Sequence, residues 1–321
     1  MPALSALRTW VGRQPLYLDA RWTWREGLRP AWRRVRIQRQ ILKTPPVRTA
    51  RRGPVEVRVL TWWRDWVNIV WALKSFYHFA GVDYPLYIHD GGLRPANLDA
   101  LQQHFPDCHL VLEQESNARV SELLSARGLE RCQSYRLRNV ATRKLLDYFL
   151  LSDADCIISV DSDIVFFRRP TELCVPADQL RKNYYNRDEN YWYSLTPQEC
   201  ESELGVVPQP YVNSGLFLVR RESIDFESIE RWLKNPKLFA DAWVSEQTLH
   251  ALCSSAYGVG LLPDSYLVST RPGLKDDLVC KHYPGFFRPL LYEEGMAHLI
   301  RTGFLKALCV SRATDAREHS Q

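Results

Sequence analysis

The stretch ISVDSDIVFF, residues 158–167, constrains this chain more than any other. It places two carboxylates, Asp161 and Asp163, between two runs of apolar residues. Burying a carboxylate without a partner is expensive, and two carboxylates this close resist ionisation unless a cation or hydrogen-bond donors neutralise them. The stretch therefore requires a compensating group, and the rest of the sequence has to indicate which one.

Length and composition are those of an ordinary globular protein. The 321 residues are 45% hydrophobic, which suffices for one large α/β domain or two modest ones. No window holds 18 uninterrupted apolar residues, and the N-terminus lacks the apolar stretch of a secretion signal, so we expect a cytoplasmic protein. The eight cysteines form no C-x-x-C pair, which argues against zinc knuckles, redox motifs and a disulfide scaffold.

Charge is unevenly distributed along the chain. Residues 1–54 carry a net charge of +11, whereas the remainder carries −6. Tryptophans at positions 10, 22, 24 and 32 are interleaved with these arginines, which is typical of a segment that lies on an anionic membrane or a polyanion. The alternative is a helical extension whose tryptophans pack on the body. Residues 44–54, with three prolines, are interpreted as the linker that ends this extension, and no specific nucleic-acid binding is expected.

Residues 55–321 are predicted to form one α/β domain. A strand over 55–63 precedes a helix over 65–79, with Asp65 as its N-cap and Gly81 at its end. The order β-α-β-α-β indicates a mostly parallel sheet with helices on its faces. The remaining predicted elements are strands over 85–92, 108–113, 155–163 and 210–221, and helices over 97–105, 117–129 and 139–151.

The carboxylate pair falls at the carboxyl end of the strand over 155–163, where open α/β sheets bind ligands. Residues two apart in a strand project from one face, so Asp161 and Asp163 are predicted to aim at one point, with Ser162 turned away. Carboxylate oxygens favour Mg²⁺ or Mn²⁺, which keeps positions free for phosphate oxygens. Thr61 and Asp90, which end or follow the first two strands, are assigned to the same ligand site.

At this point the sequence resembles the nucleotide-diphospho-sugar glycosyltransferases of the GT-A fold. The segment ISVDSDIVFFRRP is similar to their Asp-x-Asp metal motif, including the apolar run and the proline that follow. The resemblance implies a GT-A fold with a basic N-terminal extension over 1–54. It assigns 55–170 to a nucleotide-sugar half, which includes Asp161 and Ser162 as donor-binding residues, and 171–321 to an acceptor half.

Three further segments resemble the family in the same order. YVNSGLFLVRR implies that Asn213, Ser214 and Gly215 contact the donor sugar, and WVSEQTLHAL implies the same of Glu246 and Gln247. CKHYPGFFRP is similar to the C-terminal His-x-x-Gly segment of glycogenin-like and bacterial galactosyltransferase-like enzymes, the family 8 type. That similarity implies His282 as the third metal ligand, with Lys281 and Gly285 beside the diphosphate.

Each of these residues has a structural alternative. Asn213 to Gly215 can shape a β-bulge, Glu246 can be a solvated charge on a helix, and His282 can be a structural histidine. Arg138, Arg143 and Lys144 precede the metal strand and are candidates for contact with the nucleotide. For these three, a solvated basic helix face is the favoured interpretation, although Lys144 is kept as a donor-site candidate.

The resemblance implies a Mn²⁺- or Mg²⁺-dependent transfer of a sugar from a nucleotide-diphosphate sugar, a UDP-sugar by analogy, to a hydroxyl acceptor. The acceptor class is a glycan, a lipid-linked sugar or a small molecule, and bacterial surface polysaccharide assembly is the expected setting. The similarity favours retention, with Asn213 near the reacting sugar, while Glu246 and Asp241 stay open as inverting bases. The rivals are a sugar nucleotidyltransferase, which usually has a Gly-rich loop that LTWWRDW lacks, and a non-catalytic module that binds nucleotide-sugars or polyanions.

Overall fold

A computed structural model describes residues 23–25, 27–285 and 288–310. The chain divides into two compact units, one formed by Pro46–Pro284 and the other by the two terminal segments, Met1–Pro45 and Gly285–Gln321. The predicted boundary at residue 54 stays a prediction. Trp10 and Trp22 of the basic extension lie outside the described residues.

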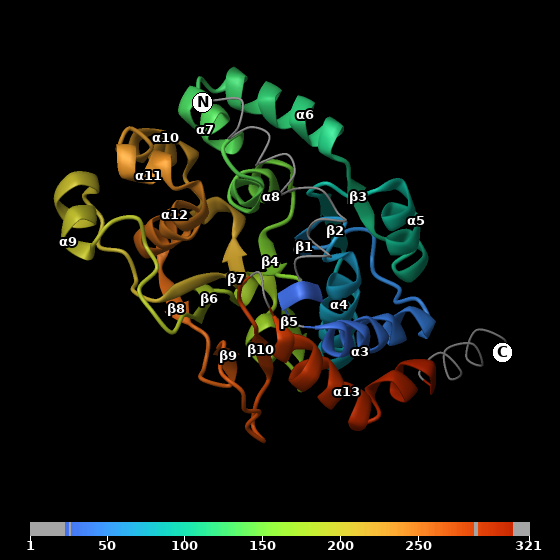
Figure 1. The fold of residues 1–321 in the computed structure, drawn as a ribbon. Helices are drawn as coiled ribbons and strands as arrows, with labels where there is room; N and C mark the ends of the chain where they lie inside the picture. The colour runs from blue at the N-terminus through green and yellow to red at the C-terminus, as the bar shows by residue number, and fades with distance from the viewer. Residues whose placement is uncertain (1–22, 26, 286–287, 311–321) are drawn as a thin grey trace. The chain divides into compact units, whose positions relative to one another are not determined.

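The larger unit is built on a ten-stranded sheet flanked by helices, as Figure 1 shows. The path of paired strands is β3-β2-β1-β4-β7-β6-β9-β10-β5, and β8 pairs with β6. Six of the nine pairings described are parallel, which agrees with the predicted mostly parallel sheet. The strands are β1 (Val55–Thr61), β2 (Leu86–Asp90), β3 (His109–Val111), β4 (Cys156–Val160), β5 (Ile164–Phe166), β6 (Asn183–Arg187), β7 (Val212–Arg220), β8 (Val259–Leu261), β9 (Tyr266–Val268) and β10 (Cys280–His282).

The first part of this unit has the predicted β-α-β-α-β order, with α4 (Trp66–Ala80) and α5 (Pro95–His104) between the strands. Strand β4 is buried at every residue, as its continuous apolar run predicts for a central strand. Helix α4 ends at Gly81, whose φ of 65° is the left-handed conformation that glycine adopts without strain. Asp65 occupies the N-cap, although its carboxylate accepts from Trp62 and Asn68 side chains rather than from the helix backbone.

The segment between β3 and β4 differs from its prediction. Helices α6 (Glu113–Ala126) and α7 (Glu130–Arg136) replace the single helix expected over 117–129. The helix predicted over 139–151 is broken into a 3₁₀ helix, η2 (Val140–Lys144), and a short α8 (Asp147–Leu150). The Asn139 side chain accepts from the Ala141 N–H and caps the start of η2.

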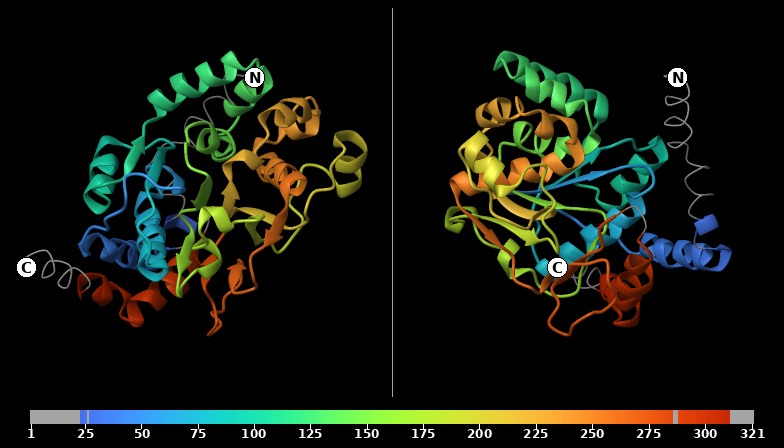
Figure 2. Two further views of the ribbon diagram at one scale, coloured as in Figure 1. Left: turned by 180° about the vertical axis from the view of Figure 1, so that it is seen from behind. Right: turned by 60° about the vertical axis from the view of Figure 1, so that its left-hand side comes forward.

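The second part of the unit reverses direction. Strand β7 is antiparallel to both β4 and β6, and short helices fill the connections. Helices α10–α12 group beside β7, and they stay together in both views of Figure 2. The helical segments here are η3 (Thr171–Leu173), η4 (Ala177–Gln179), α9 (Pro197–Glu199), the π-helical η5 (Cys200–Leu204), η6 (Arg221–Ser223), α10 (Phe226–Trp232), α11 (Pro236–Ala240) and α12 (Ala242–Tyr257).

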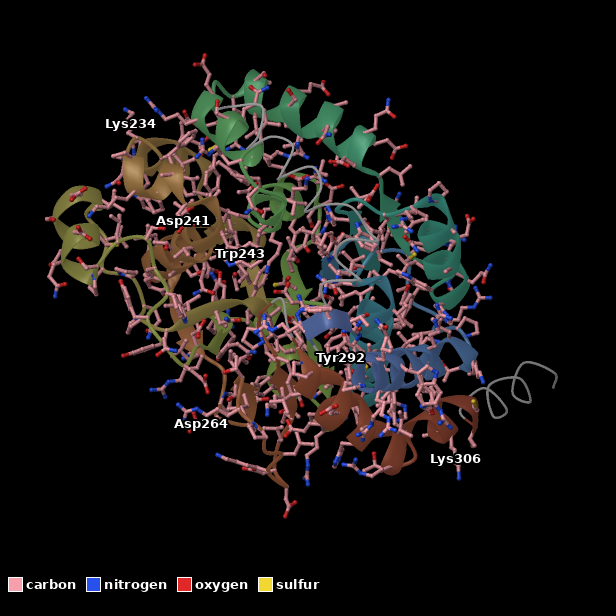
Figure 3. The ribbon with its side chains drawn as sticks, viewed as in Figure 1. Lys234, Asp241, Trp243, Asp264, Tyr292 and Lys306 are labelled. Carbon is pink, nitrogen blue, oxygen red and sulfur yellow. The ribbon has the colours of Figure 1, made fainter. Side chains whose placement is uncertain are left out.

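The smaller unit contains α3 (Leu28–Gln38), η1 (Arg39–Lys43), the π-helical η7 (Leu291–Met296) and α13 (Ala297–Arg301). Within it, the Arg34 guanidinium lies 5.9 Å from the centre of the Tyr292 ring, which Figure 3 labels. Trp24 and Trp32 are exposed, and membrane contact through residues 1–54 stays a prediction. In the described part of the chain, no helix combines the length and apolarity needed to cross a membrane. All eight cysteines are free, as the sequence predicted.

Candidate active site at the end of strand β4

The two aspartates of the opening motif lie in a turn between β4 and β5 rather than in a strand. Strand β4 ends at Val160, so the prediction that alternation along one strand aims both carboxylates is wrong. The turn is instead fixed by its neighbours. The Asp161 N–H donates to the Gly215 carbonyl (2.9 Å), and the Tyr283 N–H donates to the Asp163 carbonyl (2.9 Å). Backbone hydrogen bonds from β7 and from the end of β10 thus set the position of both carboxylates.

The structure brings the three predicted metal ligands together. The ligand atoms of Asp161, Asp163 and His282 all lie within 4.8 Å of one another. His282 reaches the turn because β10 pairs with β5 in a register that sets His282 opposite Ile164. Its Nε2 lies 3.1 Å from Asp163 Oδ1. Two carboxylates and one imidazole form a donor set suited to Mn²⁺ or Mg²⁺, so the residues fit the predicted ion.

The ring of His282 is held in one orientation by a chain of partners. Asp188 Oδ2 accepts from Asn213 Nδ2 (2.8 Å), and a carboxylate can only accept, which fixes the orientation of the Asn213 amide. Asn213 Oδ1 therefore faces His282 Nδ1 at 3.1 Å and accepts its proton. The Nε2 lone pair is left to face the carboxylates, which is the arrangement found behind metal-binding histidines.

Glycine is required next to this ring. A Cβ atom on Gly215 would lie 2.4 Å from His282 Cε1, far inside van der Waals contact. The pairing of β6 with β7 also jumps from Tyr185↔Phe217 to Asn186↔Asn213, so residues 214–216 bulge from the ladder. The bulge considered for the Asn-Ser-Gly motif is therefore present, and it coexists with contacts to the site.

Lys144 places a positive charge beside Asp161, and this contact was not predicted from the sequence. Its Nζ lies 3.0 and 3.1 Å from the two Asp161 carboxylate oxygens, and its side chain is 9% exposed. The favoured interpretation of a solvated basic face is wrong for Lys144 and Arg143, which are both buried, while Arg138 is exposed. Arg143 donates to the Asp90 carbonyl and to Glu113.

The charges at the turn are not fully balanced. Burial raises the pKa of Asp161; Lys144 opposes this shift and Asp163 adds to it, so the pKa stays raised. Burial lowers the pKa of His282, but the Asp163 carboxylate outweighs burial and the pKa is raised. Burial is therefore the main reason that ionised Asp161 is disfavoured, and Asp163 is the main reason that His282 holds a proton; a divalent cation would favour both carboxylates in their ionised form.

Glu246 lies in a separate polar pocket on α12. Its Oε2 accepts from Ser214 Oγ (2.7 Å), and its Oε1 lies 3.2 Å from His250 Nε2. Burial raises the pKa of Glu246, but Lys144, His250 and Ser214 together lower it below its ordinary value. Glu246 is 3% exposed, so the interpretation of a solvated charge is wrong. Its neighbour Gln247 accepts from the Ser214 N–H and donates to the Trp192 carbonyl, both at 3.2 Å.

The remaining predicted residues lie at varied distances from this cluster. Thr61 is buried at the end of β1, and its hydroxyl has no hydrogen-bond partner among the described residues. The Asp90 carboxylate accepts from the N–H groups of the turn after β2. Asp241 is exposed and caps the start of α12, where Figure 3 labels it beside Trp243. Ser162 is half-buried in the Asp161–Asp163 turn; Lys281 donates to the carbonyls of Arg271 and Gly273; and Gly285 belongs to the smaller unit.

Sequence reasoning missed three residues behind the site: Asp188, Tyr185 and His250. The spacing of Glu246, His250 and Ser254, four residues apart, places three polar side chains on one face of helix α12, and this signal was available. For Asp188 and Tyr185 no local pattern exists, because their partners come from β7 and α12.

Comparison with known proteins tests the fold. No family model matches the sequence, and no curated protein matches it. Among solved structures, an active-site mutant of the protein LgtC is 13% identical, with 80% of this chain and 95% of that chain covered at a TM-score of 0.51. Apo xyloside xylosyltransferase 1 from mouse is 13% identical (74% and 98% covered, TM-score 0.47). The mannosyltransferase Ktr4p from S. cerevisiae is 9% identical (73% and 77% covered, TM-score 0.44).

The likeness to LgtC confirms the predicted fold class. The chain has a GT-A fold, with a central sheet flanked by helices and an acidic turn after a buried strand. At 13% identity the likeness defines the architecture only. The family 8-type assignment stays a prediction.

Proposed function

We propose that this chain is a metal-dependent glycosyltransferase that moves a sugar from a nucleotide-diphosphate sugar to a hydroxyl acceptor. The donor we propose is a UDP-sugar, and the acceptor a glycan, a lipid-linked sugar or a small molecule. The observation that carries the proposal is the cluster of Asp161, Asp163 and His282 at the carboxyl end of β4, where open α/β sheets bind ligands. The GT-A fold agrees with this chemistry, and the proposal rests on the residues of the site.

Asp163 and His282 are the buried members of the cluster and would hold Mn²⁺ or Mg²⁺, while Asp161 shares the ion or bonds the ribose. Such an ion, when bound, supplies electrostatic stabilisation for the negative charge that develops on a leaving diphosphate. Asn213 fixes the ring of His282, and Asp188 fixes Asn213, so this side of the site is organised before any ligand arrives.

The chain also supplies groups for the rest of the donor. Lys144 places a fixed positive charge between Asp161 and Glu246, since it pairs with the first and lowers the pKa of the second. The buried Thr61 hydroxyl, which has no partner among the described residues, is available to a nucleotide at the end of β1. Glu246 and Gln247 lie beside Ser214 and are proposed to bind hydroxyls of the donor sugar.

The positions of the two acidic candidates favour retention over inversion. An inverting base must reach the acceptor hydroxyl. Glu246 is 3% exposed and already accepts from Ser214, so it is poorly placed to take a proton from an incoming acceptor. Asp241 is exposed but caps α12 through the Val244 N–H. We therefore propose a retaining transfer in which neither carboxylate acts as the base.

A donor screen tests the proposal. Purified full-length protein is heated with UDP-glucose, UDP-galactose, UDP-N-acetylglucosamine or GDP-mannose, each with Mn²⁺ or with EDTA, and product release is followed in parallel. We expect one of these donors to raise the melting temperature when Mn²⁺ is present but not in EDTA. The protein should also hydrolyse that donor slowly to a nucleoside diphosphate. Turnover that persists in EDTA would contradict the metal role.

The same screen separates the rival functions by their products. A sugar nucleotidyltransferase consumes a nucleoside triphosphate and a sugar phosphate and releases pyrophosphate, so the screen includes UTP with glucose 1-phosphate. A non-catalytic module would show the thermal shift without any product. Either result would overturn the proposed transfer reaction, and each points to a different replacement.

A further inference from the structure

A row of polar side chains runs through the apolar core behind Glu246. The row crosses from β6 to α12 and comprises Asn183, Ser254, Tyr185 and His250. All four side chains are fully buried, and the His250 ring is surrounded by the aromatic rings of Phe149, Phe217 and Tyr185. Polar groups buried among aromatic rings weaken a fold unless they are all satisfied, so a complete row of this kind requires a reason.

The far end of the row has a fixed direction. Asn183 Oδ1 accepts from the Arg220 backbone N–H (2.9 Å), so its Nδ2 is the donor toward Ser254 Oγ (2.8 Å). If the Asn183 amide were flipped, its Nδ2 would face the Arg220 backbone N–H, so that two donors would oppose each other. Ser254 Oγ thus accepts from Asn183 Nδ2, and its own proton is free to be donated to Tyr185 Oη, which lies 2.8 Å away.

The near end independently requires the same direction. Glu246 is an ionised acceptor whose pKa is lowered, so the atom that faces it must carry a proton. His250 Nε2 is that atom: it lies 3.2 Å from Glu246 Oε1, outside hydrogen-bond geometry but within ion-pair distance, and neither atom has a hydrogen-bond partner among the described residues. A neutral ring with its proton on Nε2 accepts at Nδ1, and Tyr185 Oη lies 3.1 Å from Nδ1. The Glu246 end therefore assigns Tyr185 as the donor to His250, and the Asn183 end is compatible with this direction.

We propose that His250, oriented by Tyr185, is a positioning residue that holds the Glu246 carboxylate in its working rotamer and ionised state. Ser214 binds one carboxylate oxygen and His250 faces the other, so Glu246 is fixed from two sides on the edge of the proposed donor site. Tyr185 does not contact Glu246 and acts on it only through His250. The effect on turnover rests on the proposed function, whereas the effect on stability does not.

Tyr185→Phe tests this relay, because it removes one oxygen and keeps the ring. With UDP-glucose, UDP-galactose or GDP-mannose plus Mn²⁺, we expect kcat for donor hydrolysis to fall about tenfold, the equivalent of one hydrogen bond, with KM changed less. His250→Phe, which removes the donor itself, should lower kcat by about 10²-fold, and His250→Gln, which keeps an N–H near the same place, should recover most of it. Cys253→Ala is the matched control, since it alters a buried side chain of the same helix outside the relay.

The decisive comparison uses Glu246→Gln as the background. If Tyr185 acts through His250 on Glu246, adding Tyr185→Phe to Glu246→Gln should not lower kcat further, and it should lower the urea midpoint by less than Tyr185→Phe does alone, because only the bond to Ser254 is still lost. Fully additive effects in both measurements would overturn the relay and leave Tyr185 as a packing residue. If the wild type turns over none of the donors, the proposed function fails, and the unfolding comparison still tests the relay.

Discussion

Two of the buried acidic sites in the described part of the chain compensate their charge in opposite ways. At the turn after β4, Asp161 and Asp163 lie close together with Lys144 and His282, and burial keeps the pKa of Asp161 raised. On α12, Glu246 has Ser214, His250 and Lys144 as partners, and its pKa is lowered. At the first site ionisation of Asp161 is disfavoured until a cation joins it, whereas at the second the surrounding side chains already favour the ionised form of Glu246. We infer from this difference that the turn at Asp161 and Asp163 binds a cationic ligand, whereas the partners of Glu246 hold its side chain in place.

The largest expected effect comes from the turn at Asp161 and Asp163. Asp163→Asn should lower turnover by about 10³-fold or more, because it removes a proposed ligand of the ion that stabilises the leaving diphosphate. The free energy of unfolding in EDTA should change by less than about 1 kcal/mol, since one of two like charges is lost and the shape is kept. Steady-state turnover and urea unfolding measure the two quantities. A stability loss as large as that of Glu246→Gln would remove the distinction between the sites.

The site at Glu246 should behave in the opposite way toward stability. Glu246→Gln places an amide N–H₂ against donors, so we expect a loss of about 1–3 kcal/mol at neutral pH. The pKa of Glu246 is lowered in the folded protein, so its stabilisation is present above its ordinary pKa of 4.5 and is lost as the pH falls through the folded value. The wild type and the variant should therefore converge in acid. The test is to measure the urea midpoints of both proteins from neutral pH downward. If the difference between the two midpoints stayed constant over this range, Glu246 would not be ionised in the folded protein.

An intermediate effect is expected from the frame behind the ion site. Asp188→Asn removes the group that fixes the Asn213 amide, so His282 loses its single orientation. We expect Mn²⁺ affinity to weaken about 10- to 100-fold, with fold and maximal turnover at saturating Mn²⁺ largely kept. Calorimetric titration with Mn²⁺ tests this prediction. The control is Asp264→Asn, which changes an exposed acid in the turn before β9. Unchanged affinity would show that Asn213 holds the histidine unaided.

The same contrast explains what could be predicted from the sequence. The strands up to β4 and helix α4 were predictable because each carries its own signal in the sequence. Strand β4 has a continuous apolar run, and α4 has an apolar stripe and a glycine that ends it. The metal triad was predictable only by resemblance, since His282 lies far along the chain and reaches Asp163 through the β5–β10 register. The turn at Asp161–Asp163 was missed because alternation in the sequence looks the same whether a strand continues or ends.

Buried charges were the least predictable part. Lys144 and Arg143 belong to a short 3₁₀ helix whose sequence looks like a solvated basic face. Their partners, Asp161 and Glu113, come from other elements, so no local pattern shows that the charges are paired. His250 was hidden for the same reason, because the hydroxyl of Tyr185 reaches it from β6 across the sheet–helix interface. Tertiary contacts decided these cases, and only the spacing along α12 left a trace in the sequence.

An exposed acid provides the smallest effect and a reference for both buried sites. Glu199 pairs with Lys237 and caps α9, and the hydrogen bond from Lys237 lowers its pKa to about 2. Its stabilisation is thus present above its ordinary pKa of 4.5 and is lost toward about 2. Because water and salt screen this pair, Glu199→Gln should leave turnover unchanged and shift the urea midpoint only slightly, and less at high salt. If this surface pair proved as important as Glu246, burial would not be what separates the acidic sites, and the relay behind Glu246 would lose its physical basis.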